Sequence, residues 1–78
     1  MFTINKEVDT RFLNPPQPML RTLRAMHGME RGQVLKLTTT EDNAIHNMEL
    51  LCRETGLVLM QYMDWDGEFT FLIRKHHN

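Results

Sequence analysis

The sequence predicts an α/β (α+β) two-layer sandwich, in which two helices cover one face of a four-stranded mixed sheet in the order β-α-β-α-β-β. Two segments carry apolar residues at helical spacing, four have the composition of strands, and turn residues separate them. Placing both helices on one face of a sheet is the simplest way to bury their apolar stripes in a chain of 78 residues. We expect residues 1–78 to form a single domain, because one core ordinarily occupies roughly 50 to 200 residues.

The first strand is expected between Phe2 and Leu13, where apolar and polar residues alternate except near residues 6 and 7. The proline-rich stretch 14–18 ends it, and a helix follows because proline is accepted in the first turn of a helix. In segment 19–27 the apolar residues recur every three or four positions, which predicts an amphipathic helix that ends at Gly28. The residues of this predicted apolar face are Met19, Leu20, Leu23 and Met26.

A short strand is expected at residues 33–38, followed by a second helix. Thr40 is the predicted N-cap, and Glu41 and Asp42 would place negative charge in the first turn, where the helix dipole favours it. Gly56 would end this helix. Its predicted apolar stripe consists of Ala44, Ile45, Met48, Leu51 and Cys52.

The last two strands, at residues 57–63 and 68–74, are expected to form an antiparallel hairpin, because the Asp66-Gly67 pair favours a tight turn. Trp65 at this turn is expected to pack back over the sheet, although it could instead be an exposed contact residue. Residues 75–78 are expected to be a frayed end. The predicted core consists of Leu20, Leu23, Leu35, Leu37, Ile45, Met48 and Leu51.

Charge and composition exclude several classes of function. Nine Lys and Arg against ten Asp and Glu give a net charge of −1, so a dedicated nucleic-acid binder is disfavoured. No serine occurs in the chain, which rules out catalysis by a serine nucleophile. The sequence contains neither a long apolar stretch nor a signal peptide, so we expect a cytoplasmic protein that does not associate with membranes.

A single cysteine, Cys52, excludes an internal disulfide and a multi-thiolate metal site. The four histidines do not have the spacing of a metal-binding set, and we therefore expect neither a metal nor a cofactor. These histidines are His27, His46, His76 and His77.

Residues 8–18, with the sequence VDTRFLNPPQP, resemble the opening of the TusA/SirA-like sulfur-carrier family, where Leu-Asp, a few residues, Cys-Pro-x-Pro and a helix occur in that order. The ending at residues 72–75 and the position of Cys52 in the second helix also agree, so the resemblance covers about residues 8 to 75. The resemblance implies the sandwich predicted above, a fold also found in the C-terminal domain of a bacterial translation initiation factor. It further implies a persulfide relay, in which the motif cysteine accepts sulfur from a cysteine desulfurase or rhodanese for uses such as tRNA thiolation.

The chain departs from this motif at Pro15, which stands where the family has its sulfur-carrying cysteine. Proline has no nucleophile, so we expect a binding or regulatory module without a catalytic residue. Two alternatives are a sulfur carrier that uses Cys52, although a thiol on an apolar stripe is expected to be buried and unreactive, and a small RNA-binding domain.

The candidate binding surface surrounds the proline-rich start of the first helix. Prolines restrict the backbone and so reduce the entropy lost on docking, and arginines on the helix could meet an acidic partner. The expected partner is a protein of the cysteine desulfurase or rhodanese type. The candidate residues are Asn14, Pro15, Pro16, Gln17, Pro18, Arg21 and Arg24.

Overall fold

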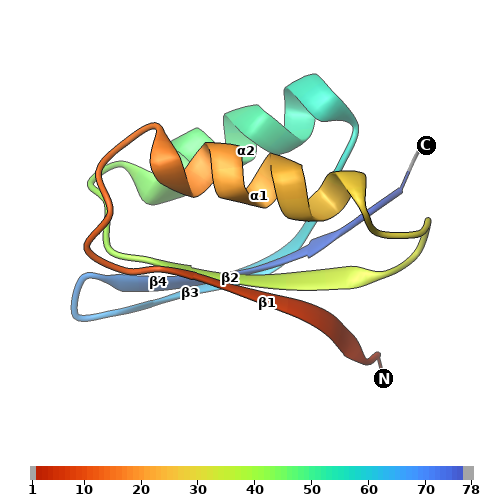
Figure 1. Ribbon diagram of the computed structural model, residues 1–78. Helices are drawn as coiled ribbons and strands as arrows, with labels where there is room; N and C mark the ends of the chain where they lie inside the picture. Colours follow the sequence, from red (N-terminus) through yellow and green to blue (C-terminus); the bar gives the residue numbers. More distant parts are fainter. Residues whose placement is uncertain (1, 77–78) are drawn as a thin grey trace.

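The computed structural model describes residues 2–76 and consists of a sheet covered on one face by two helices (Figure 1). Its elements are β1 (Ile4–Thr10), α1 (Gln17–His27), β2 (Val34–Thr39), α2 (Ala44–Thr55), β3 (Val58–Trp65) and β4 (Glu68–Arg74). The sheet order is β1-β2-β4-β3, in which β1 runs parallel to β2 while the other neighbours are antiparallel. The predicted two-layer sandwich with a mixed sheet is therefore confirmed.

The core lies between the two central strands and the helices. Alternate residues of a strand point to the same face of the sheet, so β2 and β4 each direct a row of apolar side chains toward the helices. The fully buried residues of these rows are Leu35, Leu37, Phe71 and Ile73. From α2, Met48 and Leu51 complete the core, as predicted, whereas Leu23 and Ile45 are only partly buried at its border.

Helix α1 buries a face that overlaps only in part with the predicted one, since Met26 is buried as predicted. It begins at Gln17, and the row Pro18, Thr22 and Met26 faces the sheet. Thr22 can occupy this buried row because its hydroxyl donates a hydrogen bond of 2.8 Å to the Pro18 carbonyl. Leu20 consequently points outward with 45% of its surface exposed, so its expected place in the core is wrong, and Met19 of the predicted apolar face is also exposed.

Helix α2 begins later than expected. Thr40 is not its N-cap, because the Thr40 hydroxyl accepts a hydrogen bond from the backbone N–H of Phe12 at 2.8 Å. Asn43 precedes the helix in the left-handed conformation (φ 61°), and Glu41 and Asp42 lie in the preceding loop instead of the first turn. The Thr40 hydroxyl, which the local pattern predicts as the helix cap, therefore bonds instead to Phe12, a residue distant in the sequence.

The strand boundaries that differ most from the prediction are the ends of β1 and β3. Strand β1 ends at Thr10, because the chain turns back there and the Leu13 N–H donates to the Thr10 carbonyl at 3.1 Å. Strand β3 continues to Trp65, since the hairpin needs only Asp66 and Gly67, both at positive φ, to reverse direction. The predicted antiparallel hairpin is confirmed, but Trp65 does not pack over the sheet: 82% of its surface is exposed.

Lys75 belongs to the folded structure and is not part of a frayed end. Its backbone continues the sheet, with its N–H donating to the Gln33 carbonyl at 2.9 Å. Its ammonium donates to the carbonyls of Met26 at 2.8 Å and Met29 at 2.6 Å, where α1 ends. A cation at this end of a helix complements the helix dipole, and here it adds hydrogen bonds to two carbonyls at and just beyond the last turn. Residues 77 and 78 of the expected frayed end, including His77, lie outside the described residues.

Replacing Lys75 by methionine is expected to lower the free energy of unfolding by about 1.5 to 3 kcal/mol, the range for hydrogen bonds to charged groups. Urea denaturation followed by circular dichroism measures this loss. Lys36→Met is the matched control, because the Lys36 ammonium lies 3.9 Å from the Glu7 carboxylate in an exposed pair. Such a pair contributes less than about 1 kcal/mol, so equal losses in the two variants would contradict the role given to Lys75.

Candidate functional site

The proline-rich segment 14–18 links the turn after β1 to the first turn of α1. Its start is fixed by the hydrogen bond from Phe12 to Thr40, and the Gln17 N–H donates to the Asn14 carbonyl at 2.9 Å. Pro18 lies in the first turn of α1 and is buried, and the Pro16 carbonyl accepts the Leu20 N–H at 3.0 Å. The segment is thus held at both ends, while residues 14–17 remain exposed.

Asn14 and Pro15 line a pocket of about 420 Å³ between the proline-rich segment and the loop that precedes α2. Phe12, itself 85% exposed, forms part of the rim. The other lining residues are Leu13, Thr40, Glu41, Asp42, Asn43 and Asn47. Oxygen acceptors and amides dominate this lining, and none of these residues carries a thiol.

Glu41 is the buried carboxyl group of this pocket, with 7% of its surface exposed. Burial raises the pKa of Glu41 because the charged form loses its hydration, and a hydrogen bond of 3.3 Å from the Asn47 amide partly opposes this effect. The Glu41 N–H is bonded to the Thr39 hydroxyl at 3.3 Å, which fixes the loop next to the carboxyl group.

Arg21 and Arg24 lie on the other side of α1, in a groove of about 400 Å³ between this helix and β1. Lys6 from β1 adds a third cation to the lining, and Glu7 and Asp9 add two carboxylates. The other lining residues are Val8, Ala25, Gly28 and Met29. Within residues 2–76, neither arginine forms an ion pair, so both guanidinium groups are available to an external anion.

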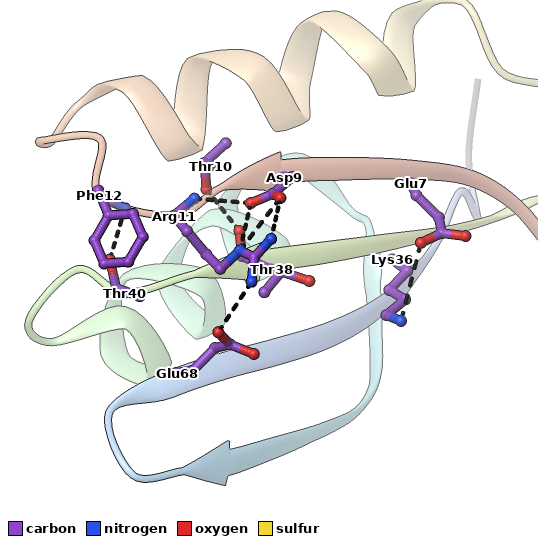
Figure 2. A network of polar contacts seen from close by, with 9 residues as sticks. All are labelled: Glu7, Asp9, Thr10, Arg11, Phe12, Lys36, Thr38, Thr40 and Glu68. Carbon is purple, nitrogen blue, oxygen red and sulfur yellow. Dashed lines mark hydrogen bonds and ion pairs between the residues drawn. The ribbon is translucent and has the colours of Figure 1, made fainter.

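Arg11 links β1 to the hairpin, as Figure 2 shows. Its guanidinium contacts the Asp9 carboxylate at 2.7 Å and the Glu68 carboxylate at 3.5 Å. The hydrogen bonds from Arg11 lower the pKa of Asp9 to about 2, and the pKa of Arg11 is raised by the same contacts. Arg11 is therefore already paired with carboxylates, whereas Arg21 and Arg24 form no ion pair within residues 2–76.

Cys52 is buried on α2, with 5% of its surface exposed. Burial raises the pKa of its thiol to about 11, because the thiolate would be poorly hydrated there. The expected burial of Cys52 on the apolar stripe is confirmed.

The predicted binding residues do not share one surface, and the expected place of Pro18 on such a surface is wrong, because its side chain is buried in α1. Asn14 and Pro15 belong to the pocket beside α2, whereas Arg21 and Arg24 belong to the groove beside β1. Arg21 also borders a hollow lined by Phe12 and Leu13, which connects the two surfaces around the start of α1. Sequence patterning missed Glu41 and Asn47 as pocket residues, since their contact depends on how the loop before α2 folds.

Two further properties concern residues 2–76 alone. No group of three His, Cys, Asp or Glu side chains within this range is arranged to hold a metal ion. Neither helix there is long and apolar enough to cross a bilayer.

The sequence on both sides of residues 14–18 matches a known protein family. The family model described as sulfurtransferase TusA matches residues 6–75. The chain belongs to the TusA family. The similarity to the sulfur carriers inferred from residues 8–18 is therefore confirmed, and the TusA match includes both the proline-rich segment and Cys52.

Individual TusA proteins agree with this assignment. Sulfur carrier protein TusA of Allochromatium vinosum is 33% identical over 75 residues, covering 96% of this chain and 99% of the relative. Sulfur carrier protein TusA of Pseudomonas putida (strain GB-1) is 27% identical over 74 residues, covering 95% of this chain and 92% of the relative. The crystal structure of a SirA-like protein from Desulfitobacterium hafniense has the same fold, with a TM-score of 0.78, 20% identity, and coverage of 92% of this chain and 99% of that one.

Proposed function

We propose that this member of the TusA sulfur-carrier family is a binding or regulatory module of sulfur trafficking that does not itself carry sulfur. The observation that supports this function most directly is the proline at position 15, where the family resemblance places the sulfur-carrying cysteine. The only thiol of the chain, Cys52, is buried and has a raised pKa, which weighs against its use as a substitute carrier.

The proposed docking surface is the ordered start of α1. Its exposed candidate residues are Asn14, Pro15, Pro16, Gln17, Arg21 and Arg24, whereas Pro18 is buried and supports the segment from within the fold. The segment is held by Thr40 at one end and by the helix at the other, so it would lose little conformational entropy on docking. Arg21 and Arg24, which form no ion pair within residues 2–76, favour a partner with an acidic surface, and we assign this role to a sulfur-transfer protein of the cysteine desulfurase or rhodanese type.

Sulfur transfer is tested by incubating the protein with a cysteine desulfurase and cysteine and measuring its mass. The wild type is expected to gain no sulfur, whereas Pro15→Cys is expected to gain about 32 Da at residue 15 as a persulfide. Pro15→Ser is the matched control, because it also removes the proline ring but supplies no thiol. A stable persulfide on Cys52 of the wild type would contradict the proposal and restore the sulfur-carrier alternative.

Binding is tested by calorimetric titration against desulfurase and rhodanese proteins. Arg21→Glu is expected to weaken binding at least tenfold, equivalent to about 1.4 kcal/mol, because it replaces an exposed cation of the docking surface by an anion. Arg53→Glu is the matched control, since Arg53 is an exposed arginine in the last turn of α2. An equal loss in both variants would indicate a non-specific charge effect, and no binding by the wild type to any of these proteins would contradict the assigned class of partner.

A further inference from the structure

Strand β3 forms one edge of the sheet and pairs only with β4 among residues 2–76. Its first half is partly buried, but residues 61–65 are exposed. Three large side chains of this half face solvent: Tyr62 is 44% exposed, Met63 61% and Trp65 82%. An edge strand also presents unpaired backbone N–H and carbonyl groups, which are a template for another strand.

The two edges of the sheet differ in how they are protected. Strand β1 carries charged residues at positions 6, 7 and 9, and charge is a common means of preventing edge pairing. Strand β3 contains neither lysine nor proline, and Asp64 is its only charged residue. Its irregular pairing lies between Leu59 and Gln61, so the exposed half from Gln61 onward remains regular. The unprotected edge is therefore also the edge that exposes the largest apolar side chains.

The charges beside β3 favour an antiparallel over a parallel pair of copies. The hairpin tip carries Asp64 and Asp66, whereas Arg74 lies at the opposite end, next to Val58. Arg74 forms no ion pair within residues 2–76 and is partly exposed. A two-fold axis that crosses β3 turns the acidic tip of each copy toward the end of the sheet at which Arg74 of the other copy lies, whereas a parallel arrangement in register would place the two Asp64 carboxylates side by side.

We propose that β3 is a self-association edge, at which two copies of this chain pair antiparallel through residues 61–65. The two-fold axis passes beside Met63, so that Met63 lies opposite Met63 of the second copy and Gln61 lies opposite its Trp65. Tyr62 then lies opposite Asp64 of the second copy, where its hydroxyl can donate a hydrogen bond to a carboxylate. No like charges face each other along this register, and the four strands of each sheet become one sheet of eight.

The proposed pairing leaves the candidate docking surface open. Helix α1 packs over β1, at the other edge of the sheet, while α2 lies beside β3 (Figure 1). The groove that contains Arg21 and Arg24 lies between α1 and β1, so self-association does not cover it. This inference is therefore independent of the function proposed above.

Sedimentation equilibrium tests the pairing directly. Five residues per copy make a small interface, so the wild type is expected to dimerise with a Kd of roughly 0.1 mM. Met63→Lys is expected to raise this Kd at least tenfold, because it places two ammonium groups opposite each other. Met19→Lys makes the same change on α1 and is expected to leave the Kd unchanged. Circular dichroism and thermal denaturation establish that each variant is folded.

Trp65 is the only tryptophan, so its fluorescence gives a second measurement at the same edge. Its emission is expected to shift to shorter wavelength as the wild-type concentration rises, and to be independent of concentration in Met63→Lys. A wild type that remains monomeric at about 1 mM would overturn the proposal. A dimer that persists in Met63→Lys, or one that Met19→Lys disrupts equally, would overturn the assignment of the interface to β3.

Discussion

Phe71→Ala is expected to lower the free energy of unfolding by about 3 to 5 kcal/mol, the range for truncating a buried phenylalanine. Phe71 is fully buried on central strand β4, between Leu37 of β2 and Tyr62 of β3 in the register of the sheet. Its ring centroid lies 5.9 Å from that of Tyr62 and 6.4 Å from that of Phe69. Removing the ring therefore leaves a cavity that rigid neighbours on both strands cannot fill.

This loss is large relative to the whole stability of the protein. At about 0.05 to 0.15 kcal/mol per residue, a chain of 78 residues has roughly 4 to 12 kcal/mol of stability. Urea denaturation followed by circular dichroism measures the effect. Phe12→Ala is the matched control, because Phe12 is 85% exposed and its truncation is expected to cost less than about 0.5 kcal/mol. A loss below about 1 kcal/mol for Phe71→Ala would show that the core is packed differently.

The Cys52 thiol is expected to react with DTNB at least about a hundredfold more slowly in the folded protein than in the denatured one. Two effects combine: the side chain is buried, and its pKa is raised to about 11. At pH 8 a group with that pKa is about one part in a thousand thiolate, whereas a thiol with the ordinary pKa of about 8.5 is roughly one quarter thiolate. The labelling rate of the folded protein should therefore rise steeply as the pH is increased from 8 toward 11.

Pro15→Cys supplies the matched comparison within the same fold. Position 15 is exposed, so the added thiol is expected to react rapidly while Cys52 stays protected. Peptide mapping by mass spectrometry assigns the label to one residue or the other. Labelling of Cys52 in the folded wild type at the rate of the denatured protein would contradict its burial.

The fold could be predicted from sequence because its main signals are local. The Asp66-Gly67 turn and the apolar spacing in α2 each depend on neighbouring residues, and the structure confirms both. The two glycines that follow the helices also lie where the helices end. Gly56 adopts the positive φ of 76° that glycine accepts most easily.

The incorrect predictions concern a side-chain group and a helix face whose contacts are made by residues distant in the sequence. Thr40 has the character of an N-cap, but its hydroxyl is taken by Phe12, which lies 28 residues away. Leu20 fits an apolar helix stripe, but the angle at which α1 packs buries Thr22 in its place. Neither outcome can be deduced from spacing, because each depends on how elements meet in three dimensions.

The candidate site was predicted only in part, for the same reason. The motif placed residues 14–18 correctly at the start of α1. It did not indicate that Asn14 and Arg21 would lie on separate surfaces, since that separation follows from the path of the chain around the helix. Glu41 and Asn47 became pocket residues through the loop before α2, whose conformation depends on the contacts of Thr39 and Thr40.

The clamping of the proline-rich segment at both ends has an evolutionary consequence. Thr40 holds the backbone before it and α1 holds the backbone after it, so the exposed side chain at position 15 carries little of the folding energy. Substitutions at position 15 can therefore change the chemical reactivity of this side chain without disturbing the core. On the function proposed above, a change of one amino acid would exchange a sulfur-carrying protein for a binding module on the same scaffold, and the reverse change would restore the carrier.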